Sequence, residues 1–145
     1  MDVVTCAIRR EVDVYLAIGR GRDMATTLGL DEIDRTRVEI AILELARNIL
    51  AHASSGELRF ELVDSDNRRG LLVEARDSGP GIPDIDLALR DGYSTTKTLG
   101  AGLPGVRRLM DDFTIRSEVG VGTVVRAIKW LAKPRSRRQP GGRQP

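Results

Sequence analysis

The sequence contains little that could form cross-links, a metal cluster or a membrane span. It has one cysteine, Cys6, and one histidine, His52, in 145 residues. A single cysteine excludes an intrachain disulfide, a zinc cluster and a CxxC redox pair. No uncharged apolar run approaches the roughly 18 residues of a membrane helix, and residues 1–5 lack the features of a secretory signal. These absences predict a soluble protein of a reducing cytoplasm.

The composition that remains is typical of a globular domain with a charged tail. Hydrophobic residues make up 41% of the chain and charged residues 30%, which excludes wholesale disorder. Residues 133–145 hold five of the 23 basic residues and no acidic ones, so the rest has 18 basic and 21 acidic residues and a net charge of −3. With 3% aromatic residues, such a body has no nucleic-acid footprint. We predict a domain over residues 1–132, a disordered basic tail over 133–145, and neither nucleic acid nor a membrane as a partner.

Hydrophobic periodicity and turn residues predict the order β-α-α-β-β-α-β-β, with one additional short helix. The expected strands are residues 3–10, 57–63, 71–77, 113–118 and 122–131, and the expected helices are residues 11–28, 31–53, 85–90 and 102–111. This order predicts an α+β two-layer sandwich, in which a mixed, largely antiparallel sheet carries its helices on one face. It excludes a Rossmann alternation of strands and helices.

The two long helices differ in their apolar pattern. The helix at 31–53, which Asp31 or Asp34 can cap, has apolar residues spaced four, three and four apart at Val38, Ile42, Leu45 and Ile49. This spacing predicts one buried face and a central position. The helix at 11–28 takes its apolar residues from Val12, Leu16, Met24 and Leu28. Gly19 and Gly21 interrupt it, and each glycine costs about 1 kcal/mol relative to alanine, so we expect a weak middle.

Glu44 and Asn48 lie four residues apart on the predicted central helix and therefore share one face. That face lies to one side of the buried stripe, where side chains can meet a groove. The carboxylate could act as a base, and the amide oxygen could bind Mg²⁺, which prefers oxygen ligands. Taken alone, the pair favours a solvated helix face.

Two glycine-containing segments follow in the chain. Residues 77–83 follow a predicted strand, and Asp77 is the last residue of that strand. Its carboxylate could accept a hydrogen bond from an amine of a flat ligand, and the glycines would let such a ligand approach the backbone closely. A tight turn explains that segment equally well. Residues 99–105 lead into a helix, whose free N–H groups could bind an anion. A flexible loop is the alternative, because a lone glycine motif is weak evidence.

In combination and in this order, the three segments resemble the GHKL ATPase/kinase superfamily, which has the Bergerat fold. Glu44 and Asn48 are similar to its N box. Residues 77–81 are similar to its G1 box, 100–102 to its G2 box and 120–123 to its last glycine–threonine element. The resemblance covers roughly residues 3–131.

The chain length selects a branch within this superfamily. It leaves no space for the second domain of gyrase, heat-shock protein 90 and MutL relatives, or for the dimerisation helix of histidine kinases. The chain therefore resembles the small serine/threonine kinases and anti-sigma factors. The segments at 44–48, 91–95, 99–111 and 127–130 are most similar to the stressosome switch kinases of the RsbT type.

The resemblance implies ATP and Mg²⁺ as cofactors. Asn48 would bind the Mg²⁺ that bridges the phosphates, and Glu44 would be the base for the incoming serine or threonine hydroxyl. Asp77 would accept a hydrogen bond from the adenine amino group, with Thr123 supporting it through water. The other residues implied to contact the nucleotide are Gly79, Gly81, Ile82, Lys97, Gly100, Ala101, Gly102 and Leu103, and residues 84–103 would form a lid over it. A solvated lysine is the alternative for Lys97.

The resemblance also implies protein partners. The phosphoacceptor would be a STAS-domain antagonist, and its phosphorylation would release the kinase to activate a PP2C-type phosphatase or another output protein in stress signalling. Two alternatives remain: an anti-sigma factor kinase that binds a sigma factor directly, and a non-catalytic module that binds ATP. The segment at 99–106 favours the switch kinase, and the set of Glu44, Asn48 and Asp77 argues against the non-catalytic module.

Overall fold

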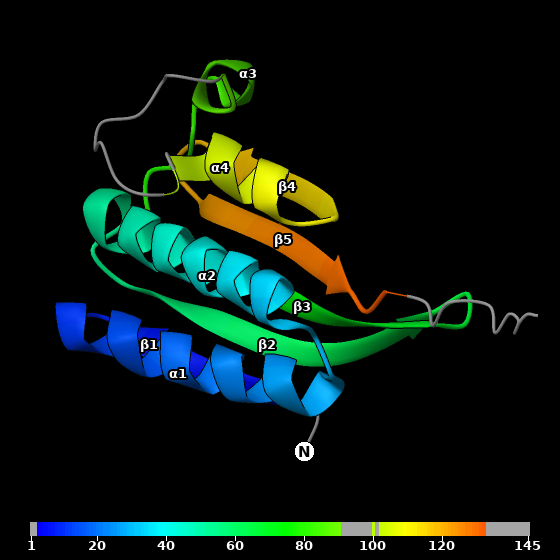
Figure 1. Ribbon diagram of the computed structural model, residues 1–145. Helices are drawn as coiled ribbons and strands as arrows, with labels where there is room; N and C mark the ends of the chain where they lie inside the picture. Colours follow the sequence, from blue (N-terminus) through cyan, green and yellow to red (C-terminus); the bar gives the residue numbers. More distant parts are fainter. Residues whose placement is uncertain (1–2, 91–99, 101, 133–145) are drawn as a thin grey trace, which may run out of the picture.

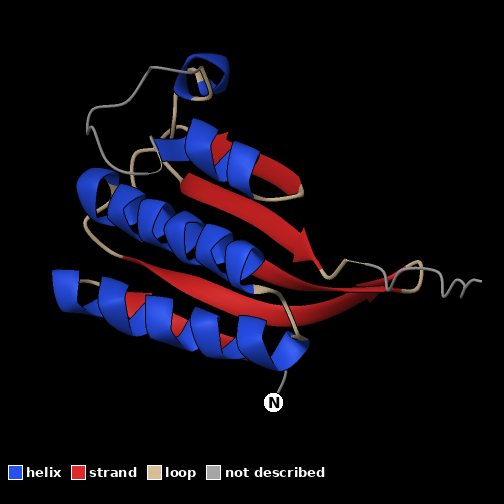
Figure 2. Cartoon of the chain, in the orientation of Figure 1, coloured by secondary structure: helices blue, strands red, loops and turns tan. Residues whose placement is uncertain are grey.

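The computed structural model describes residues 3–90, 100 and 102–132, which form a five-stranded sheet with its long helices on one face (Figure 1; Figure 2). The strands are β1 (Val3–Ile8), β2 (Gly56–Ser65), β3 (Arg68–Asp77), β4 (Asp112–Glu118) and β5 (Gly122–Trp130), and the helices are α1 (Glu11–Leu28), α2 (Glu32–His52), α3 (Ile85–Ala88) and α4 (Gly102–Leu109). The predicted tail at 133–145 lies outside the described residues.

The strand order is β1-β2-β3-β5-β4, and each of the four pairings is antiparallel. The predicted α+β sandwich is therefore confirmed. The prediction was a mixed, largely antiparallel sheet, and the sheet of the described residues is antiparallel throughout. In the same part of the chain, no helix is both long enough and apolar enough to cross a membrane.

The hairpin between β2 and β3 is longer than the sequence indicated. The expected strands end at residue 63 and begin again at residue 71, but only Asp66 and Asn67 separate β2 from β3. Both have left-handed backbone conformations, with φ of 50° and 64°. Asp and Asn tolerate this conformation, and it matches the twist of a two-residue hairpin. Polar residues at the ends of both strands had concealed their pairing.

Helix α2 lies between α1 and α4 over the sheet (Figure 1). Asp31 caps it by accepting a hydrogen bond from the Asp34 backbone N–H at 2.8 Å. The predicted apolar stripe is confirmed, because Val38, Ile42, Leu45 and Ile49 are all buried. Glu44 and Asn48 lie to one side of this stripe, as their spacing predicted, and reach the cavity described below.

Helix α1 is continuous through both glycines, but only half of its predicted apolar residues face the core. Leu28 is buried and Met24 packs partly buried against the core, whereas Val12 and Leu16 are 48% and 61% exposed. The other buried residues of the helix are Val14, Ala17, Gly21 and Ala25. A Cβ atom at Gly21 would lie 2.2 Å from Cδ1 of Ile42, so small residues allow α1 to approach α2 closely. Close packing, rather than side-chain size, selects this face.

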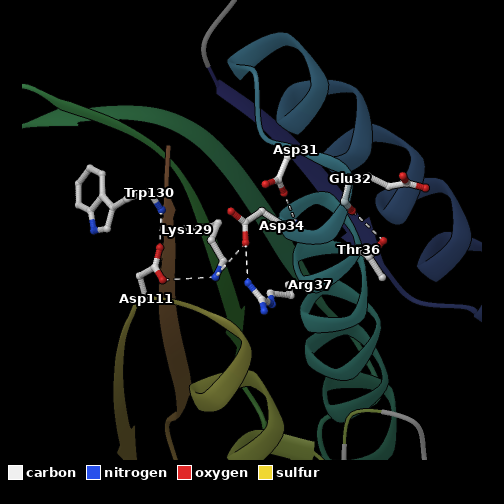
Figure 3. A network of polar contacts seen from close by, with 8 residues as sticks. All are labelled: Asp31, Glu32, Asp34, Thr36, Arg37, Asp111, Lys129 and Trp130. Carbon is white, nitrogen blue, oxygen red and sulfur yellow. Dashed lines mark hydrogen bonds and ion pairs between the residues drawn. The ribbon is translucent and has the colours of Figure 1, made fainter. Parts of the chain in front are cut away.

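A buried lysine fastens the first turn of α2 to β5 (Figure 3). Lys129 is 4% exposed, and its Nζ atom lies 3.8 Å from Asp34 Oδ1 and 3.3 Å from Asp111 Oδ1. The other Asp111 oxygen accepts the backbone N–H of Trp130 at 2.8 Å. Arg37 also pairs with Asp34, at 2.9 Å. The network connects the beginning of α2 with the segment between α4 and β4.

Lys129→Met is expected to lower the free energy of unfolding by about 1–3 kcal/mol, because it removes a buried positive charge from beside two carboxylates that are 19% and 43% exposed. Arg37→Met is the matched control. Arg37 is about half exposed, and exposed ion pairs contribute at most about 1 kcal/mol. Urea unfolding of both variants measures the difference. Equal losses in the two would show that burial does not strengthen the Lys129 contacts.

Candidate functional site

Residues from four distant parts of the chain surround one cavity of about 410 Å³, a size within the roughly 300–1,000 Å³ of small-molecule sites. The second half of α2 forms one wall. The end of β3, the loop after it and helix α3 form another, and the beginnings of α4 and β5 complete the lining. Eight of the predicted site residues line this cavity: Glu44, Asn48, Asp77, Gly81, Ile82, Gly102, Leu103 and Thr123.

The remaining predicted residues have other positions. A Cβ atom at Gly79 would lie 2.6 Å from Cβ of Ala53, so this glycine packs against the end of α2 and does not line the cavity. Gly100 is buried, and a Cβ atom there would lie 2.6 Å from Cγ of Glu44, so this glycine packs against the Glu44 side chain. Lys97 and Ala101 lie outside the described residues.

The Glu44 carboxylate is only 3% exposed and is held by backbone amides. The N–H of Gly100 donates to Oε2 at 2.9 Å, and the N–H of Gly102 donates to Oε1 at 3.1 Å. Such bonds to an ionised acceptor offset the cost of burying its charge. Glu44 therefore connects α2 to the glycine segment at the beginning of α4.

Asp77 and Thr123 are paired neighbours on β3 and β5. Asp77 Oδ1 accepts the Gly79 N–H at 2.9 Å, which fixes the carboxylate at the end of its strand. The Thr123 hydroxyl lies 2.7 Å from the Ser117 hydroxyl, and the Ser117 oxygen accepts the Ile82 N–H at 2.7 Å. A hydroxyl pair therefore joins the loop after β3 to the floor of the cavity.

The sequence analysis gave no role to three polar residues at this site. Ser117 pairs with Thr123 across the β4–β5 hairpin, and only strand register reveals this. Arg47 and His52 also line the cavity. Helical spacing could have found them, because Arg47 lies three residues after Glu44 and His52 lies four residues after Asn48. The Arg47 guanidinium lies 3.8 Å from the Glu11 carboxylate of α1, which places α1 next to the site.

The polar groups suit a nucleotide better than a metal ion alone. Within residues 3–90, 100 and 102–132, no three His, Cys, Asp or Glu side chains are grouped to hold a metal ion. Asn48 offers one amide oxygen, and Mg²⁺ in nucleotide sites takes most of its other ligands from phosphates and water. The Asp77 carboxylate could accept a hydrogen bond from an amine, and Glu44 is a second carboxylate on the same cavity, with both oxygens accepting backbone N–H groups.

Comparisons with known proteins identify the family of this chain. A family model described as "Histidine kinase-like ATPase domain" matches residues 10–129. The serine/threonine-protein kinase RsbT of Bacillus subtilis is 48% identical over 124 residues, which are 86% of this chain and 93% of that protein. An anti-sigma F factor of Geobacillus kaustophilus is 30% identical over 114 residues, covering 74% of this chain and 75% of that one.

A solved structure agrees with the fold. The RsbU and RsbW domains of Rv1364c from Mycobacterium tuberculosis match with a TM-score of 0.61 at 15% identity. The match covers 92% of this chain and 34% of the longer one. At this identity the likeness establishes the arrangement of strands and helices alone.

Proposed function

This chain belongs to the family of histidine kinase-like ATPase domains, and from that premise we propose that it is an Mg-ATP-dependent protein serine/threonine kinase that acts as a partner switch. ATP as the nucleotide follows from the family. The observation that carries the kinase assignment is the cavity shared by Glu44, Asn48 and Asp77. In this cavity Glu44 would be the proton acceptor, Asn48 would supply an amide oxygen to a metal ion, and Asp77 would accept a hydrogen bond from the amino group of the adenine. The similarity to a serine/threonine kinase over 86% of the chain supports it.

Asp77 and Thr123 would recognise the adenine. The carboxylate would accept a hydrogen bond from the exocyclic amino group. Thr123 lies beside Asp77 in the strand register, and its hydroxyl is fixed by Ser117, so it would hold a bridging water. Gly81 has a φ of 81°, and a Cβ atom there would lie 2.5 Å from the Glu118 carbonyl oxygen. The lack of a side chain at Gly81 therefore lets the loop after β3 pack directly against the end of β4.

Asn48 and Glu44 would serve the phosphate end. Asn48 would contribute its amide oxygen to a Mg²⁺ ion that neutralises phosphate charge. Phosphoryl transfer depends mostly on positioning and charge neutralisation, with one acceptor for the proton of the nucleophile. Glu44 would take the proton from a serine or threonine hydroxyl. The hydroxyl oxygen would then bond to the γ-phosphorus as the bond between that phosphorus and the ADP oxygen breaks.

The protein substrate in this proposal is a STAS-domain antagonist. Its phosphorylation would release the kinase to bind a PP2C-type phosphatase or another output protein. The test is transfer of labelled phosphate from Mg-ATP to STAS-domain proteins of the same genome, with the modified residue located by mass spectrometry. Incorporation into a serine or threonine supports the proposal. Absence of transfer to every STAS protein, with ATP binding intact, would overturn the substrate assignment.

A second function has an observation in its favour. The 30% identity to an anti-sigma F factor over 74% of this chain supports direct binding of a sigma factor by the same fold. Titration of the purified chain with the sigma factors of the same genome, with and without ATP, separates the two. A complex with a sigma factor favours the alternative, and a complex with a STAS protein or a PP2C-type phosphatase favours the switch kinase.

Asp77→Asn is expected to weaken ATP binding by about 10–100-fold, the usual effect of losing a hydrogen bond to a charged group. The amide oxygen can still accept the Gly79 N–H, and the NH₂ group then opposes the adenine amino group, since both are donors. Isothermal titration calorimetry measures the affinity.

Asp64→Asn is the matched control, because Asp64 lies near the far end of the same β2–β3 hairpin. Its carboxylate pairs with Arg69 at 3.3 Å and is 75% exposed. Its ATP affinity should equal that of the parent. Unchanged affinity in Asp77→Asn as well would refute the role given to Asp77.

A further inference from the structure

The backbone N–H groups of Gly100 and Gly102, at the beginning of α4, bind a negatively charged group of the protein itself, the carboxylate of Glu44. The N–H groups of Gly100 and Gly102 point at the two oxygens of one carboxylate, at 2.9 and 3.1 Å. Amides that converge in this way form a site for a negatively charged group. The resemblance to the GHKL superfamily implies that Gly100 and Gly102 contact the nucleotide, and in the proposed function their N–H groups would bind the ATP phosphates.

The position of the Gly100 amide is set by the protein itself. A Cβ atom at Gly105 would lie 1.4 Å from the Gly100 carbonyl oxygen, and one at Gly100 would lie 2.6 Å from Glu44 Cγ. The peptide at Gly100 therefore lies between helix α4 and the Glu44 side chain, in contact with both. Because this peptide is closely packed on both sides, it has little room to move. The simplest way for its amide to bind a phosphate is therefore to exchange the Glu44 carboxylate for the phosphate as hydrogen-bond acceptor.

We propose that Glu44 competes with the nucleotide phosphates for the Gly100 and Gly102 amides, so that ATP binding displaces the carboxylate from them. An amide N–H makes one well-aligned hydrogen bond, so each amide serves the carboxylate or a phosphate oxygen. This deepens the proposed function and rests on it. Displacement frees both carboxylate oxygens from these backbone N–H donors, so that either oxygen can turn to the substrate hydroxyl when phosphate occupies the site.

The exchange predicts an effect on affinity opposite to that of an ordinary binding residue. Glu44→Gln removes the charged competitor. Glu44→Asp keeps the charge but withdraws the carboxylate by one methylene from both amides. Both variants of the full chain should bind Mg-ADP about tenfold more tightly than the parent, since hydrogen bonds to a charged group need not be broken first. Adenosine, which has no phosphate, should bind all three proteins equally.

Calorimetric titration with Mg-ADP and with adenosine distinguishes the outcomes. ADP affinity unchanged or weakened in both variants would overturn the exchange. Tightening in Glu44→Gln but not in Glu44→Asp would also overturn it, since charge repulsion alone would then be the cause. If the parent transfers phosphate while the affinities do not change, only the exchange fails. If none of the three proteins binds ADP, the proposed function fails with it.

A second measurement needs no variant and covers the case in which substitution disturbs folding. In the parent protein, the NMR signals of the Gly100 and Gly102 amides and of the Glu44 carboxyl carbon report the contact directly. Saturation with Mg-ADP should shift all three signals together. An unchanged Glu44 carboxyl signal at saturation would show that carboxylate and phosphate do not exchange.

Discussion

Glu44→Gln is expected to lower the rate of phosphoryl transfer to the protein substrate by about 10²–10⁴-fold, the usual contribution of a positioned general base. Glutamine has the same shape and length but cannot take the hydroxyl proton. The rate is measured at saturating Mg-ATP with labelled nucleotide. Saturation matters because the same substitution is expected to raise nucleotide affinity, which would otherwise conceal part of the loss.

Glu39→Gln is the matched control for this prediction. Glu39 lies on the same helix, and its carboxylate pairs with Arg22 at 3.1 Å, away from the cavity lining. Its transfer rate should equal that of the parent. A Glu44→Gln protein that transfers phosphate at the parental rate would show that another group accepts the proton.

Gly105→Ala is expected to cost about 3 kcal/mol of folding free energy, at the upper end of the range for overpacking. Its Cβ atom would lie 1.4 Å from the Gly100 carbonyl oxygen. This neighbour is a backbone atom, which cannot rotate away as the end of a side chain can. Relief requires α4 and the Gly100 peptide to separate, which also moves the amide that Glu44 holds. Weaker binding of Mg-ADP should therefore accompany the loss of stability.

Gly19→Ala provides the control, because Gly19 also lies inside a helix. A Cβ atom there would meet no other atom within 4 Å. Alanine should stabilise the protein by about 0.5–1 kcal/mol, through helix propensity and a less flexible unfolded chain. Urea unfolding and ADP titration of both variants test the pair. Similar stability changes at the two positions would mean that the Gly100–Gly105 contact is not tight.

Periodicity predicted most of the fold because it depends on local chemistry. The stripe from Val38 to Ile49 recurs at helical spacing, so α2 and its central place could be inferred before any contact was known. The buried face of α1 could not be inferred in this way. Val12 and Leu16 are large and apolar yet exposed, while Gly21 is buried against Ile42. Which face of a helix is buried depends on how closely its neighbour approaches.

The sequence alone determined the order of elements and the residue types of the candidate site, since Glu44 and Asn48 share a helix face and Asp77 ends a strand. It could not determine contacts between segments that are distant in the chain. Ser117 reaches Thr123 only through strand register, and Glu44 meets the Gly100 and Gly102 amides only because α4 packs beside α2. Local spacing fixes the direction of a side chain, whereas its partners depend on the packing of the whole chain.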